Sequence, residues 1–201
     1  MPSIPVHLTV AGIAADTLGV TDMPSFLLGN IAPDAVNADS FAPKEVRYGA
    51  HIRSHDRTQW KKNISEFRDR KQSDYADCPD FFKGVLMHLY TDIAWDEAVQ
   101  PKLFRYLREK GVPEEDITRR KWQELDKLDS LLAAGPGYRR LTALLAKAEA
   151  RAVTTVTAQQ LSRWQDIIVS EEYPEPSDCF LGMNDVMLTL SHALSLYNQY
   201  R

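Results

Sequence analysis

Residues 81–99 read FFKGVLMHLYTDIAWDEAV, and this stretch decides the fold class. Its apolar side chains recur at intervals of three and four positions, which is the spacing of one face of an α-helix. The preceding Cys78-Pro79-Asp80 is a helix start signal in which Asp80 is the expected N-cap. We therefore expect a helix that begins at Asp80 and runs through residue 99.

The same helical period recurs on both sides of this stretch, whereas alternating strand patterns are few and short. Helices are expected over residues 5–17, 57–70, 101–110, 113–133, 138–151, 158–170 and 178–200. Residues 21–50 are expected to be irregular, because proline, glycine and asparagine punctuate them. No linker or internal repeat divides the chain, so residues 1–201 are predicted to form a single all-α domain of seven or eight helices.

The composition excludes several classes of protein. A chain of 201 residues with 44% hydrophobic and 26% charged residues can bury a core, which excludes an intrinsically disordered protein. A net charge of -4 argues against nucleic-acid binding as a main role, because such proteins are usually basic. No apolar run of about 18 residues is present, so no transmembrane segment is expected. The apolar start contains His7 and Asp16 and lacks a basic region, so no signal peptide is expected and the location is predicted to be cytoplasmic.

Positive charge is concentrated between residues 43 and 74, where nine Lys or Arg and five Asp or Glu occur. A solvated helix face explains such a segment, and so does a basic rim that attracts an anionic substrate. Arg53 and Arg57 lie in this segment and are candidates to neutralise a substrate phosphate.

The central helix carries His88 and Asp92 at positions i and i+4, so both side chains leave one face about one turn apart. Asp96 continues the same line. An imidazole nitrogen and a carboxylate oxygen at this spacing can hold one divalent metal ion. A charged Asp92 among apolar side chains is costly without a partner. The spacing alone leaves a second interpretation open, in which Asp92 pairs with an arginine and His88 is a hydrogen-bonded core histidine.

Further candidate ligands lie elsewhere in the chain. His51 and His55 form another i, i+4 pair in HIRSHDRTQW, which alone is a weak metal signal. Asp34 follows an apolar lead-in in FLLGNIAPDA, where an Asx-turn or an N-cap would also explain a carboxylate. His7 in the apolar first helix and His192 near the end are, taken singly, more typical of core histidines.

Four stretches together resemble the zinc-dependent phospholipase C family, namely MPSIPVHLTVA, FLLGNIAPDAV, the SH of HIRSHDRTQW, and FFKGVLMHLYTDIAWDE. They cover roughly residues 1–98, and the resemblance is to the small intracellular bacterial branch of that family. It implies an all-α fold of the phospholipase C and P1 nuclease type, with residues 99–201 as a helical remainder. It also implies a metal-dependent hydrolase, a zinc phosphoesterase that acts by metal-activated water on a small phosphodiester or a phospholipid headgroup.

By position in these motifs, the resemblance implies one or two Zn²⁺ ions held by His7, Asp34, His55, His88 and Asp92. His55 matches through the SH dipeptide, and His51 is the competing assignment. Asp34 is the candidate general base, because it could contact both a metal ion and its water. Asp96 and His51 are candidates to orient the ligands or to replace one of them.

Two other functions remain open from the sequence. His55-Asp56 is similar to the HD dipeptide of HD-type phosphohydrolases, in which Asp56 would bind metal rather than cap a helix. A non-catalytic helical binding module with a degenerate metal site is the other alternative, because no histidine follows Asp92 until His192. A catalytic metal keeps an open coordination position and a structural zinc does not, so access to the site separates these functions.

Overall fold

The computed structural model describes residues 2–200, which fold into helices joined by loops and contain no β-strand. The α-helices are α1 (Ile4–Ala14), α2 (Met23–Ile31), α3 (Lys44–Ala50), α4 (Arg57–Lys71), α5 (Pro79–Ala98), α6 (Gln100–Glu109), α7 (Ile117–Ala133), α8 (Pro136–Leu145), α9 (Ala158–Ser170) and α10 (Met183–Gln199). Short 3-10 helices are η1 (Ala32–Asn37), η2 (Gln72–Tyr75) and η3 (Glu114–Asp116). The predicted all-α class is confirmed. Among residues 2–200, no helix combines the length and the apolar character needed to cross a bilayer.

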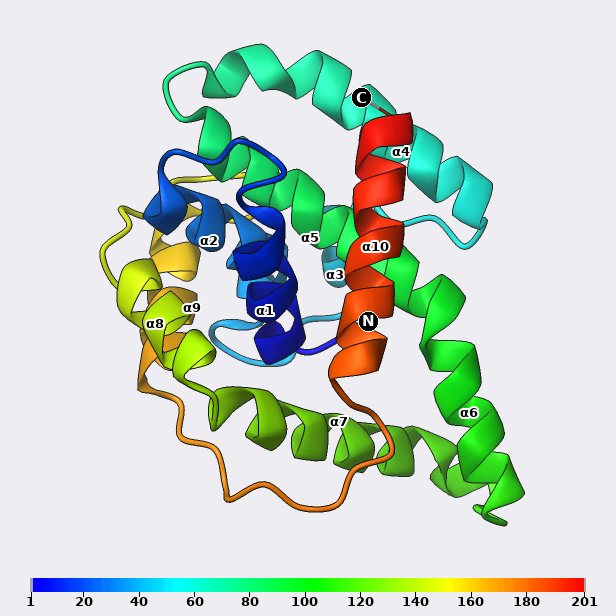
Figure 1. Cartoon of the computed structure of the whole chain (residues 1–201). Coiled ribbons are helices and arrows are strands. Elements are labelled where there is room, and N and C mark those ends of the chain that lie inside the picture. The colour runs from blue at the N-terminus through cyan, green and yellow to red at the C-terminus, as the bar shows by residue number, and fades with distance from the viewer. Residues whose placement is uncertain (1, 201) are drawn as a thin grey trace.

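Helix α5 is the centre of the fold because apolar residues surround most of its circumference. It is buried along nearly its whole length. Helices α2 and α10 pack against it, and α1 contacts α2, α5, α7, α8 and α10. Figure 1 shows α1 in the middle of the molecule, with α8 on one side, α10 on the other and α7 crossing below. The buried apolar side chains form one core to which α1 and α5 both contribute. Polar residues on the buried faces of these two helices therefore lie in the interior.

Two glycines allow α2 and α5 to cross at very short distance. A Cβ atom on Gly29 of α2 would lie 1.9 Å from the carbonyl oxygen of Phe81. A Cβ atom on Gly84 of α5 would lie 2.0 Å from the carbonyl oxygen of Phe26. Both distances are far below van der Waals contact, and the opposing atoms belong to backbone that cannot rotate away. The glycines therefore bring α2 against the N-terminal part of α5.

Most of the predicted helices are confirmed, with shifts at their ends. Helix α9 has the predicted bounds, and α4 and α6 differ from theirs by one residue at one or both ends. Helix α1 ends at Ala14 rather than at residue 17, and α8 ends at Leu145 rather than at residue 151. The segment predicted over residues 113–133 divides into η3 and α7, and α10 begins at Met183 rather than at residue 178.

The expectation of an irregular segment over residues 21–50 is wrong, because α2, η1 and α3 lie within it. The Asp22 side chain caps α2 by accepting a hydrogen bond from the Ser25 backbone nitrogen at 3.2 Å. Pro24 and Pro33 stand in the first turns of α2 and η1, where a missing backbone N–H costs no helical hydrogen bond. These prolines therefore begin helices, and the described chain has ten α-helices instead of seven or eight.

Asp80 does not cap α5 as predicted. Cys78 holds the N-cap position without a side-chain hydrogen bond, and Asp80 lies in the first turn. The Asp80 carboxylate accepts hydrogen bonds from the backbone nitrogens of Thr21 and Asp22, both at 2.7 Å, and from Lys83 Nζ at 2.8 Å. Asp80 thus ties the start of α5 to the loop that precedes α2.

Candidate metal centre

Five ionisable side chains from four elements meet in the interior. They are His7 on α1, Asp34 in η1, His51 at the C-terminal end of α3, and His88 and Asp92 on α5. The three histidines and Asp92 are fully buried, whereas Asp34 is 8% exposed. In the described part of the chain these residues form two groups that could hold a metal ion, and both groups include His88.

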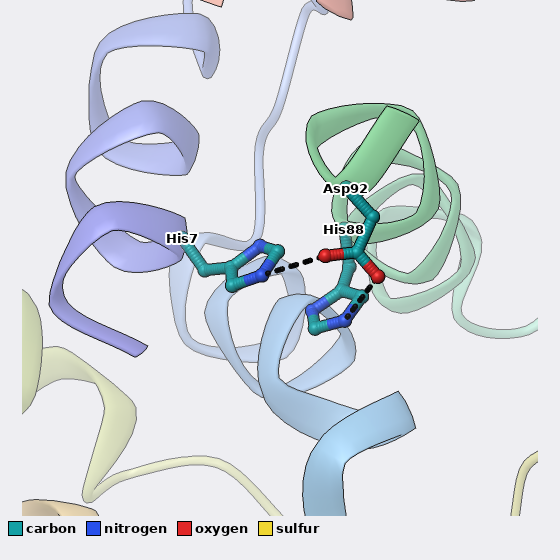
Figure 2. A group of neighbouring side chains, drawn as sticks. All are labelled: His7, His88 and Asp92. Atoms are coloured by element: carbon teal, nitrogen blue, oxygen red, sulfur yellow. Dashed lines mark ion pairs between the residues drawn. The ribbon is translucent and has the colours of Figure 1, made fainter. Parts of the chain in front are cut away.

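The first group joins α1 to α5. Figure 2 shows the His7 ring facing the Asp92 carboxylate, with the His88 ring lying beside them. The distance from His7 Nε2 to Asp92 Oδ1 is 3.4 Å, and that from His88 Nε2 to Asp92 Oδ2 is 3.8 Å. The rings of His7 and His88 are stacked, with centroids 3.8 Å apart. Both oxygens of one carboxylate are therefore directed at ring nitrogens.

The second group joins η1 and α3 to the same helix. His51 Nε2 lies 3.2 Å from Asp34 Oδ1, 3.2 Å from His88 Nε2 and 3.6 Å from Asp92 Oδ2. His51 thus stands between the two carboxylates. Because Asp92 approaches His7 with one oxygen and His51 with the other, the two groups are parts of one centre.

Backbone carbonyl groups fix the orientation of two of the rings. His88 Nδ1 lies 2.6 Å from the Asn30 carbonyl oxygen, and His51 Nδ1 lies 2.8 Å from the Arg47 carbonyl oxygen. A carbonyl oxygen can only accept, so each Nδ1 must carry the proton and donate it. The Nε2 atoms of both rings are then directed into the centre. Histidines that ligate metals almost always donate their other ring nitrogen in this way.

Several buried polar atoms in the centre have no hydrogen bond. Within the described residues, both ring nitrogens of His7 and both carboxylate oxygens of Asp92 lack one. A buried carboxylate without a partner is costly, since it has lost its hydration and gained nothing in return. A cation placed among these atoms would supply the missing interaction.

The pKa values of these groups show which of them are charged in the interior. Burial lowers the pKa of His88 to about 3, so its ring is neutral. Burial also opposes ionisation of Asp34 and Asp92, but the surrounding histidines outweigh it and hold the pKa of both carboxyl groups below the usual range. Burial disfavours the His51 cation, yet the hydrogen bond with Asp34 raises its pKa. Two ionised carboxyl groups therefore lie in the interior beside the neutral ring of His88.

The structure brings His51 into the centre and places His55 outside it, which reverses the preferred assignment from the sequence. The reason is the chain path, because α3 ends at Ala50 and α4 begins at Arg57, so the two histidines do not share a helix face. Ile52 between them has a φ of 53°, which turns the backbone. His55 is exposed, and its ring centroid lies 5.4 Å from that of Tyr48.

Asp96 and the two candidate arginines lie beside the centre. Arg53 Nη2 donates to Asp96 Oδ2 at 2.6 Å, and Arg57 Nη2 donates to the Asp96 backbone oxygen at 3.0 Å. Asp96 belongs to neither group of potential ligands. Its carboxylate holds the Arg53 guanidinium in place. His192 also belongs to neither group, and its Nε2 lies 2.7 Å from Glu97 Oε2.

Asn30 is a functional residue that the sequence reasoning missed. Its carbonyl oxygen orients His88, as described above. With the side-chain amide turned so that both of its polar atoms are paired, Asn30 also donates to the His7 carbonyl oxygen at 2.9 Å and accepts from the His88 backbone nitrogen at 3.3 Å. The signal in the sequence was an asparagine within the apolar run FLLGNI, and in the structure this residue is fully buried.

A cavity of about 490 Å³ lies against one side of the centre. Asp34 lines this cavity, and so do the basic residues Lys44, Arg47, Arg53 and Lys121. The other four members of the centre are fully buried, so Asp34 forms the contact between the centre and the cavity. Among the members of the centre, the cavity thus touches Asp34 alone.

No family model, no curated protein and no solved structure matches this chain. The position of Asp56 argues against one alternative from the sequence, because an HD-type site requires this residue as a ligand. Asp56 is exposed and caps α4, accepting a hydrogen bond from the Gln59 backbone nitrogen at 2.7 Å.

Proposed function

We propose that this protein is a zinc-dependent phosphoesterase that hydrolyses a phosphodiester, as its resemblance to the zinc-dependent phospholipase C family implies. One observation carries the proposal. The Nε2 atoms of His51 and His88 face each other at 3.2 Å while both Nδ1 atoms point at carbonyl oxygens. Two acceptor nitrogens at this distance need a proton or a cation between them.

A proton satisfies only part of the centre. A proton held by His51 can serve one neighbour, but the oxygens of Asp92 and the nitrogens of His7 remain without hydrogen bonds. A divalent cation interacts with several of these atoms at once, and its charge balances the two carboxylates. Metal binding to such a site releases the protons that the ligands carry.

The donor set favours zinc. Three imidazoles with two carboxylates suit Zn²⁺, whereas Ca²⁺ and Mg²⁺ prefer oxygen ligands alone. Asp34 and His51 would hold one ion, and His7 and Asp92 would hold a second, with His88 available to either. The centre thus accommodates one or two ions.

Access through Asp34 supports catalysis rather than a purely structural role, because a structural zinc is closed by protein ligands. Zinc in such a site supplies a water whose pKa is lowered to about 7 and polarises a phosphoryl oxygen. Asp34, at the wall of the cavity, would accept the proton of the attacking water. Arg53, held by Asp96, would bind a phosphate oxygen from the same cavity.

The test is the metal content of the purified, tag-free protein together with hydrolysis of bis(4-nitrophenyl) phosphate. We expect about one or two equivalents of zinc per chain, loss of activity on chelation, and recovery when zinc is restored. Less than about a tenth of an equivalent, with no uptake of added zinc, would contradict the proposal. Stoichiometric zinc without hydrolysis of any phosphodiester would favour the non-catalytic binding module.

Asp92→Asn tests the assignment of the centre itself. The amide cannot replace the negative charge that Asp92 brings to both His7 and His51, so we expect metal content and hydrolysis to be lost together. The matched control is Asp166→Asn on the exposed side of α9, which removes the same charge far from any ligand and should change neither quantity. Retention of both metal and activity by the Asp92 variant would show that the assignment is wrong.

A further inference from the structure

The cavity beside Asp34 carries more positive charge than one phosphodiester needs. Lys44 and Arg47 lie on α3, Arg53 follows that helix, and Lys121 lies on α7. Arg53 is paired with Asp96 at 2.6 Å. Among the residues that the structure describes, no ion pair is found for the other three, which are defined here as the free cations of the cavity, although the charge of Asp96 also acts on Lys121.

Aromatic rings, instead of carboxylates, hold the free cations. Lys121 Nζ lies 4.0 Å from the centroid of the Trp122 ring. The Arg47 guanidinium lies 4.3 Å from the centroid of Phe41, and its Nε donates to the Ala42 carbonyl oxygen at 3.0 Å. A ring face attracts a cation without neutralising it, so these groups keep their charge for an anion.

Lys44 and Lys121 are far apart in the sequence, but both line the cavity. Lys44 Nζ lies 5.1 Å from the centroid of Tyr48, which also lines the cavity. Lys121 is partly buried, and burial lowers its pKa against the opposing effect of the Asp96 charge, so the charged form gains from a further anionic neighbour. A lysine in this position favours a bound anion more than a solvated surface lysine does.

We propose that the cavity binds a small substrate with a second anionic group, a phosphate or a carboxylate, in addition to the phosphate that is hydrolysed. This inference rests on the proposed function, which places the hydrolysed phosphate at Asp34 and Arg53. A phosphodiester carries a single negative charge, and the centre with Arg53 is sufficient to bind it. Lys44, Arg47 and Lys121 then bind the second anionic group and determine specificity.

Two matched ligands test the proposal by isothermal titration calorimetry on the protein as purified. 3-Phosphonopropionate carries a phosphonate and a carboxylate, whereas propylphosphonate has a methyl group in place of the carboxylate. We expect the first to bind about tenfold more tightly, as one charge-assisted hydrogen bond provides. Lys121→Gln and Lys44→Gln should each reduce this preference, and the double variant should abolish it.

Arg120→Gln is the matched control, since it removes a charge from the same helix at an exposed position bonded to Gln123. It should keep the full preference. Three results would overturn the inference: equal binding of the two ligands by the wild-type protein, no binding of either, or a preference that survives the double variant.

Zinc content is measured on the same samples. Absence of zinc together with an intact preference for 3-phosphonopropionate would refute the proposed phosphoesterase but support the second anion site. Zinc without that preference would refute the second anion site but leave the proposed metal centre supported.

Discussion

At the scale of single residues, the centre depends on which ring nitrogen of each histidine carries a proton. The carbonyl oxygens of Asn30 and Arg47 decide this for His88 and His51, because they accept hydrogen bonds from Nδ1. The Nε2 lone pairs are thereby directed at the space between Asp34 and Asp92. His55 lies exposed in the loop that follows, which is why two histidines of the same segment differ in role.

The pair His51 and His55 provides a direct comparison. His51→Ala removes a nitrogen within 3.6 Å of two carboxylates and one imidazole, so we expect zinc content and hydrolysis to fall at least about tenfold. His55→Ala removes an exposed ring and should leave both near the wild-type level. Elemental analysis and the phosphodiester assay measure the two effects. The opposite order of the two variants would restore the assignment made from the sequence.

At the scale of elements, the centre is held together by the crossing of α2 and α5. The carbonyl oxygen that orients His88 belongs to α2, and His88 itself belongs to α5. Their approach is set by Gly29 and Gly84, since each faces a carbonyl oxygen of the other helix. The same helix crossing therefore determines both the packing of α2 against α5 and the orientation of His88.

Gly84→Ala tests this coupling. The added methyl group would meet the Phe26 carbonyl oxygen at 2.0 Å, so the helices must separate, at a cost of about 3 kcal/mol in the free energy of unfolding. We expect zinc affinity to fall as well, because the Asn30 carbonyl oxygen moves away from His88. Denaturant unfolding and zinc titration measure the two quantities.

Gly137→Ala in α8 is the control for the glycine substitution. A Cβ atom there meets nothing within 4 Å, so alanine should be neutral or stabilise the protein by up to about 1 kcal/mol. Unchanged stability in Gly84→Ala would show that α2 and α5 do not need the close approach.

At the scale of the whole molecule, the N-terminal segment is tied to α7 through a buried carboxyl group. Asp129 accepts a hydrogen bond from the Ser3 hydroxyl group, directly before α1. Burial raises the pKa of Asp129 to about 7, and the nearby negative charges of Asp126 and Glu171 act in the same direction against the Ser3 hydrogen bond. The folded protein therefore binds a proton at Asp129 over a pH range in which the unfolded chain does not.

The sign of the pH effect follows from this difference. Below pH 4 both states are protonated, and between about pH 4 and pH 7 the unfolded chain ionises first, so the contribution of Asp129 to stability falls as pH rises. Asp129→Asn removes the ionisation. Its free energy of unfolding relative to wild type should be about 2 to 3 kcal/mol more favourable at pH 8 than at pH 5.

Denaturant unfolding at the two pH values measures this difference, with Asp166→Asn as the exposed control that should show none. A difference that is the same at pH 5 and pH 8 would mean that Asp129 is ionised at both values in the folded protein.

The sequence by itself determined the all-α class and most of the helices, because helical periodicity and capping are local properties. The resemblance of four motifs to the zinc-dependent phospholipase C family singled out His7, Asp34, His88 and Asp92 as candidates, and the structure brings these four together. The sequence reasoning failed for residues 21–50, where prolines begin helices although they resemble interruptions.

Only the tertiary structure decided the choice of His51 over His55, the role of Asn30 and the arrangement of Lys44, Arg47 and Lys121 around one cavity. The physical reason is distance along the chain. His51 is set by where α3 ends, Asn30 by how closely two glycines let α2 approach α5, and Lys121 by the position of α7 at the cavity that α3 also lines. Such contacts join residues far apart in sequence, and no local pattern records them.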